Sequence, residues 1–151
     1  MQNPDTNIYR RCRIRTHLTQ EAWAEKLEIS VESVKRYELG LVRPADETVL
    51  RMILESGYEP LAYQHIATCT QDLQVLPQAP VDLPLSQATI RIINRLAAFF
   101  EQKRDRQLMQ IAEDGVIDAD ERPLFDAIMG ELKELAANYY AIRYADTREA
   151  G

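Results

Sequence analysis

Glycine is scarce in this chain, with 5 residues among 151, and there are only 2 cysteines. So few glycines leave little room for a glycine-rich loop of the kind that holds phosphate groups. The cysteines, Cys12 and Cys69, do not stand at metal-ligand spacing. Neither histidine, His17 or His65, has a Cys or carboxylate partner at such spacing. The sequence therefore predicts no metal site and no cofactor, and cysteines that stay as thiols.

Long apolar runs are also absent. No stretch reaches the roughly 18 apolar residues that would indicate a membrane span, and the first residues, MQNPDTNIYRRCR, lack the apolar centre of a signal peptide. We therefore expect a cytoplasmic protein without a membrane partner. No run alternates apolar and polar residues as a half-buried strand does, and helix formers dominate, so the predicted fold class is all-α. No nucleophile stands beside a base and no carboxylates pair in an apolar pattern, so we expect no enzyme.

The net charge of −6 is unevenly distributed along the chain. Residues 1–67 carry 9 Lys and Arg against 10 Asp and Glu, a net charge of −1, and residues 68–151 carry 9 against 14, a net charge of −5. This balance argues against a protein that binds nucleic acid by charge alone. To attract DNA, basic residues of the first part would have to gather on one face: Arg10, Arg11, Arg13, Arg15, Lys35, Arg36 and Arg43.

Residues 18–44, LTQEAWAEKLEISVESVKRYELGLVRP, predict two short helices, 20–27 and 30–38, joined by a tight turn. Thr19 and Ser30 are suited to cap them, and Gly40 stops the second. Each helix has one apolar face. The opposite face of the second helix carries Glu32, Ser33, Lys35 and Arg36, so the pattern indicates a helix-turn-helix with an outward polar surface.

This stretch resembles the Cro/repressor class of bacterial and phage DNA-binding domains, the XRE family. The matching residues are Leu18-Thr19-Gln20, Ala24, Ile29-Ser30, Val34, Tyr37-Glu38, Gly40 and Pro44. The resemblance implies a five-helix domain over 1–67. We expect its first helix to be capped by Asp5 or Thr6 and its fourth by Asp46. One position departs from the family: Glu28 stands where glycine is usual, and a positive φ there would cost a few tenths to about 1 kcal/mol.

The resemblance further implies that helix 30–38 enters the major groove of double-stranded operator DNA. The DNA-contacting residues would then be Gln20, Ser30, Val31, Glu32, Ser33, Lys35, Arg36 and Arg43. Arg36 can donate two hydrogen bonds to guanine and Glu32 can accept one from cytosine. The alternative for these two is an intrahelical ion pair. The family also implies a structural pair of Arg13 with Glu38, and the alternative for Arg13 is a solvated side chain.

Residues 68–85 contain three prolines and predict a linker. Ser86 is then expected to cap a long helix over 87–112. Gly115 and a capping box at 118–121 mark the turn to a last helix that reaches about residue 144. The prediction for 86–151 is thus an αα-hairpin that serves oligomerisation or interaction.

The first hairpin helix carries more apolar residues than one partner helix can cover. The surplus implies a second surface, either the N-terminal domain or a second copy of the chain. The candidate oligomerisation residues are Ile92, Leu96, Phe99, Phe100, Leu132 and Tyr139. Residues 83–143 also resemble the C-terminal half of phage-encoded lysogeny regulators, which implies prophage regulation and self-association.

Together these patterns predict a sequence-specific transcription regulator of phage or prophage type in the bacterial cytoplasm. It would bind operator DNA as a homodimer or higher oligomer. The alternative is an adaptor of antirepressor or antitoxin type, whose helix-turn-helix binds another regulatory protein. Glu28, Glu32 and the low net basicity favour that alternative.

Overall fold

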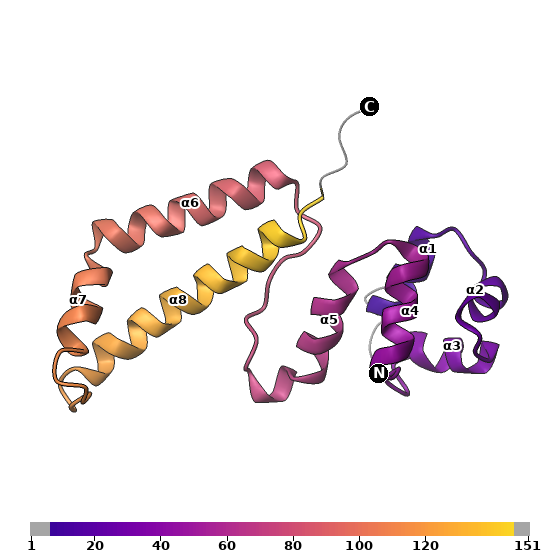
Figure 1. The fold of residues 1–151 in the computed structure, drawn as a ribbon, viewed down its shortest axis with the longest axis horizontal. Coiled ribbons are helices and arrows are strands. Elements are labelled where there is room, and N and C mark those ends of the chain that lie inside the picture. Colours follow the sequence, from indigo (N-terminus) through magenta and orange to yellow (C-terminus); the bar gives the residue numbers. More distant parts are fainter. Residues whose placement is uncertain (1–6, 147–151) are drawn as a thin grey trace. The chain divides into compact units, whose positions relative to one another are not determined.

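A computed structural model describes residues 7–146, which divide into two compact units with the boundary between Val75 and Leu76 (Figure 1). The described residues form eight α-helices and one 3-10 helix, and no β-strand occurs among them. The predicted all-α fold class is therefore confirmed. No helix in the part of the chain described here is long and apolar enough to cross a membrane.

The first unit packs its helices around one apolar core. Its elements are α1 (Ile8–Arg15), α2 (Gln20–Leu27), α3 (Val31–Glu38), α4 (Asp46–Ser56), α5 (Pro60–Cys69) and the 3-10 helix η2 (Gln71–Leu73). The core holds Tyr9, Cys12, Trp23, Ala24, Leu27, Val34, Val49, Met52, Tyr58 and Leu61. Burying a side chain such as Leu27 or Met52 stabilises the fold by roughly 1.5–3 kcal/mol, so this core is what holds the short helices together.

Side-chain caps fix where the first three helices begin. The Thr19 hydroxyl accepts from the Ala22 N–H, and the Ser30 hydroxyl accepts from the Ser33 N–H, at the two predicted caps. The cap of α1 is Asn7, whose side chain accepts from the Tyr9 and Arg10 N–H groups. The caps predicted at Asp5 or Thr6 lie outside the described residues.

The prediction that Asp46 caps the fourth helix is wrong. Ala45 holds the cap position of α4 without a side-chain hydrogen bond, and Asp46 is the first helical residue. The Asp46 carboxylate lies 3.1 Å from Nε2 of the buried His65, whose Nδ1 lies 2.8 Å from the Tyr9 hydroxyl. Burial raises the pKa of this hydroxyl to about 12. Asp46 thus ends a polar chain that joins α1, α4 and α5.

The turn between α2 and α3 places Glu28 in the left-handed region, with φ 56° and ψ 40°. The Ile29 N–H donates to the Ala24 carbonyl at 3.0 Å, which closes the last turn of α2 and brings Ile29 against the core. Only glycine adopts this conformation without strain. The exposed Glu28 carboxylate contacts Arg51 Nη1 at 2.9 Å.

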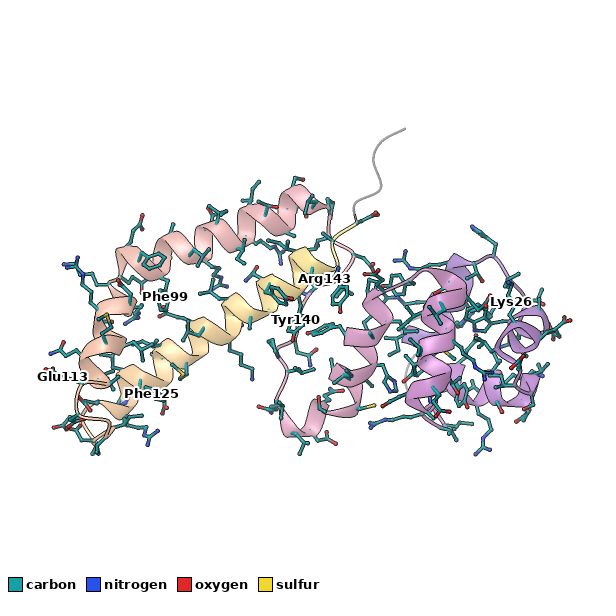
Figure 2. All side chains as sticks on the ribbon, viewed as in Figure 1. Lys26, Phe99, Glu113, Phe125, Tyr140 and Arg143 are labelled. Atoms are coloured by element: carbon teal, nitrogen blue, oxygen red, sulfur yellow. The ribbon has the colours of Figure 1, made fainter. Side chains whose placement is uncertain are left out.

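The second unit contains α6 (Leu85–Glu101), α7 (Arg104–Ile111) and α8 (Arg122–Arg143). α8 runs back along α6 (Figure 1). Next to the start of α6 and the end of α8, the Asp146 N–H donates to the Leu83 carbonyl. Ala88, Ala137 and Ala141 are buried, and their small side chains allow α6 and α8 to approach closely. At the other end, Phe99, Ile111 and Ile128 form a core, against which Phe125 packs (Figure 2).

The predicted continuous helix over 87–112 is wrong, because it breaks into α6 and α7 at Lys103, whose φ is 57°. Residues 101–107, EQKRDRQ, contain no apolar side chain, so no burial holds a straight helix there. The break lets α7 bury Ile111 and pack Leu108 in the core beside Phe99. Ser86 does not cap α6, since the cap position falls on Pro84.

The predicted capping box before the last helix is present. The Asp118 carboxylate accepts from the Glu121 N–H at 2.9 Å, and the Glu121 carboxylate accepts from the Asp118 N–H at 3.3 Å. These reciprocal bonds close the turn that ends at Glu121, the residue at the cap position of α8, where no side chain caps the helix itself.

Replacing Glu28 tests the strain in the turn. We expect Glu28→Gly to raise the free energy of unfolding by a few tenths to about 1 kcal/mol, because glycine accepts the left-handed conformation. Glu28→Ala is the matched control: it also removes the exposed contact to Arg51, which is worth about 0–1 kcal/mol, but keeps a Cβ atom. Urea denaturation would contradict this account if the two variants were equally stable.

Candidate nucleic-acid interface

Helix α3 has one face anchored in the fold and one face in solvent. Val34 and Glu38 are buried, while Glu32, Lys35 and Arg36 are exposed. The spacing of these five residues along an eight-residue helix explains the division, since positions three and four apart share a face. The exposed side chains lie at 32, 35 and 36, where they can reach a partner without disturbing the core.

The anchored face is held by an ion pair between Arg13 on α1 and Glu38 on α3. Arg13 Nε donates to Glu38 Oε1 at 2.6 Å and Nη2 donates to Oε2 at 3.0 Å, so the contact is bidentate. The two side chains are only 13% and 6% exposed. The hydrogen bonds to Glu38 raise the pKa of Arg13 above its usual range. The structure thus brings together the two residues of the predicted pair.

Two further groups complete this arrangement. Arg13 Nη1 donates to the Leu18 carbonyl at 2.8 Å, and the Gln20 amide donates to Glu38 Oε2 at 2.8 Å. Gln20 was a candidate DNA contact, and here its amide nitrogen is engaged with Glu38. One carboxylate therefore ties α1 and the start of α2 to the end of α3.

A shallow cavity of about 260 Å³ lies beside the ion pair. It is lined by Arg10, Arg13, Gln20, Lys35, Glu38 and Leu39. Arg10 and Lys35 add positive charge around the paired Arg13. Arg10 was not among the candidate site residues. It lies three residues before Arg13 on the same predicted helix, and this spacing indicates that the two side chains share a face.

The exposed ends of Glu32 and Arg36 are unpaired. Neither side chain has an ion-pair or hydrogen-bond partner among residues 7–146. The intrahelical pair that their i, i+4 spacing allows is therefore not formed. A free guanidinium and a free carboxylate stand one turn apart on the same face of α3.

The remaining candidate residues of the first unit have partners within the fold. Val31 packs against the core, and the Ser33 hydroxyl lies 2.8 Å from that of Ser30 at the start of α3. Arg43 donates to the carbonyl groups of Thr68 and Cys69, each at 3.4 Å, at the end of α5. Arg43 is thus directed towards the C-terminus of a helix, which favours a cation.

The candidate oligomerisation residues divide between core and surface. Phe99 is buried, and the half-buried Leu132 packs against the same core. Ile92 and Leu96 are half-buried, whereas Phe100 and Tyr139 are exposed. Sequence reasoning recognised a second apolar stripe on this helix but did not assign Ile90 or Ile93, which are exposed, to the site.

Within the described residues, no group of three His, Cys, Asp or Glu side chains is arranged to hold a metal ion. Cys12 and Cys69 are both free thiols. Comparison of the chain with family models, with curated proteins and with solved structures finds no match.

Removing the charge of Glu38 tests the anchoring role of the ion pair. We expect Glu38→Gln to lower the free energy of unfolding by about 3 kcal/mol, because it leaves the largely buried Arg13 cation without its counter-charge. Denaturant titration with far-UV circular dichroism measures the loss. The control is Glu55→Gln, which breaks the exposed Lys26–Glu55 contact of 3.0 Å and should cost less than about 1 kcal/mol. Equal, small losses in both variants would contradict the anchoring role.

Proposed function

We propose that this chain is a sequence-specific DNA-binding transcription regulator of the Cro/repressor type. In this proposal, helices α1 to α5 form a repressor-like domain, and α3 is its recognition helix. The second unit, with α8 folded back along α6, acts as a hairpin that joins copies of the chain. The observation that carries the proposal is the anchored α3 with its unpaired polar face.

The chemistry of that face suits direct readout of base edges. Arg36 can donate two parallel hydrogen bonds to the O6 and N7 atoms of guanine, and Glu32 can accept one from the N4 amine of cytosine. Each such contact typically gives about 1–3 kcal/mol of discrimination against the wrong base. Because neither side chain has an internal partner to give up, the free protein presents both groups without a competing ion pair.

Contacts to the DNA backbone would come from the region around the ion pair and the start of α3. The Ser33 N–H donates to the Ser30 hydroxyl, and the other N–H groups at the first turn of α3 form an environment that favours a phosphate. Lys35 and Arg10 line the cavity beside Arg13 and can supply cations to the same strand. Such contacts orient a protein on DNA without reading its sequence.

The net charge of −1 over residues 1–67 limits what one domain can contribute. Two domains held together bind two half-sites with a raised effective concentration, so affinity grows without new contacts. In helix-turn-helix dimers the half-sites lie about 34 Å apart, one turn of DNA or a multiple of it. A dimeric regulator would therefore select an inverted repeat.

An adaptor that binds another regulatory protein is the second candidate. The exposed, unpaired Glu32 on α3 favours it, because a carboxylate on this face repels phosphates. Salt separates the two: DNA binding weakens steeply as salt rises, whereas a mainly apolar protein contact does not.

Selection from a random duplex library tests the proposal with the full chain. We expect the wild-type chain to enrich an inverted repeat. Arg36→Ala should bind that sequence about 30- to 30,000-fold more weakly and lose preference at one guanine of each half-site, because about 1–3 kcal/mol of readout is gone from each of the two half-sites.

The matched control is Arg106→Ala, which removes an exposed arginine from α7 in the second unit. It should enrich the wild-type sequence. The proposal is overturned if the wild-type chain enriches nothing at low salt, or if Arg36→Ala selects the same sequence with unchanged affinity.

A further inference from the structure

Helix α6 carries a second apolar stripe that nothing in its own unit covers. Ile90, Ile93 and Phe100 are 60%, 56% and 58% exposed, and the exposed Ala97 lies between them on the same face. The opposite side of α6 is occupied, since Ala88 and Phe99 are buried in the contact with α7 and α8. The exposed stripe has the 3-4-3 spacing of a coiled-coil seam, which indicates a helix as its partner.

We propose that this stripe binds the same stripe of a second copy, with the two α6 helices antiparallel about a two-fold axis at the level of Arg95. This register places Ile90 opposite the partner's Phe100 and Ile93 opposite the partner's Ala97. Every apolar residue of the stripe then meets one of the other copy, and the contact closes as a dimer.

Side-chain size favours this register. The small Ala97 leaves space for the partner's Ile93, so the two central layers of the seam each combine a large side chain with a small one. A parallel pair would instead set Ala97 against the partner's Ala97, which leaves a gap, and Phe100 against the partner's Phe100. Packing gaps of this kind forfeit contacts that a stable interface needs.

The charge at the end of α6 favours the same direction. Glu101 is the last residue of α6, and the antiparallel register sets it level with the partner's Thr89, which is uncharged. A parallel pair would instead set Glu101 level with the partner's Glu101, and like charges repel. The helix dipoles also favour antiparallel neighbours, since each positive N-terminus then lies near a negative C-terminus.

This inference rests on the dimeric assembly of the proposed function but not on DNA binding. Its first test is therefore the mass of the full chain in solution without DNA, by sedimentation equilibrium. We expect twice the chain mass of 17.4 kDa for the wild type and a single chain mass for Ile93→Glu at the same concentration. The control is Met109→Glu, because Met109 is 74% exposed on α7 and outside the stripe, and it should stay dimeric.

Circular dichroism shows whether both variants keep the helical content of the wild type, and Phe100→Glu provides a second variant of the stripe. A wild-type chain that is monomeric, or stripe variants that stay dimeric, would overturn the inference. If the wild-type chain is monomeric, the stripe would instead be covered by another protein or by the first unit of the same chain. A dimer that depends on Ile93 in a protein that selects no DNA would overturn the proposed function and leave this inference standing.

Cysteine cross-linking tests the register, in a Cys69→Ser background that removes the exposed native thiol. Ile93→Cys and Ala97→Cys chains should form a disulfide between subunits when mixed and oxidised. Neither should do so alone, because two copies of either residue lie about 6 Å apart along the axis in addition to the distance between the helices. Cross-linking of Ile93→Cys with itself would show a parallel pair and overturn the register.

Discussion

The bidentate contact between Arg13 and Glu38 is the constraint on which the first unit depends. The acidic end of α3 is buried, and a buried carboxylate needs a counter-charge and hydrogen-bond donors. Arg13 supplies the charge, Gln20 adds a donor, and the Leu18 carbonyl occupies the remaining arm of the guanidinium. As a result α1, the start of α2 and the end of α3 share one polar junction. The orientation of α3 follows from that junction and from the caps at Thr19 and Ser30.

Each unit contains a helix with one face packed inside its own unit and another face in solvent: α3 in the first unit and α6 in the second. In α3 the inner face is committed to the core and to Arg13, which leaves Glu32 and Arg36 with no internal role. In α6 the inner face packs on α8, which leaves Ile90, Ile93 and Phe100 in solvent. The first free surface is polar and suits base edges, and the second is apolar and suits another helix. In the proposed function, recognition and self-association would therefore belong to separate units.

Local chemistry made much of the first unit predictable from its residues. Capping by Thr19 and Ser30, the turn at Glu28 and the pairing of apolar positions are short-range properties that periodicity and cap preferences reveal. The role of Asp46 was not predictable, because its partner His65 lies 19 residues away. The break at Lys103 depends on where α7 can bury Leu108 and Ile111, which is a property of α8. For the same reason the sequence could not show that Phe99 is buried and Phe100 exposed.

The central claim is that the outward face of α3 contacts DNA. Nuclear magnetic resonance of the ¹⁵N-labelled full chain tests it most directly, because a short duplex of any sequence at low salt binds through the same charges. The account predicts that the largest amide shifts fall at residues 30–36, with smaller shifts at Arg10 and Gln20. Shifts centred on another surface, or no shifts at all, would contradict it.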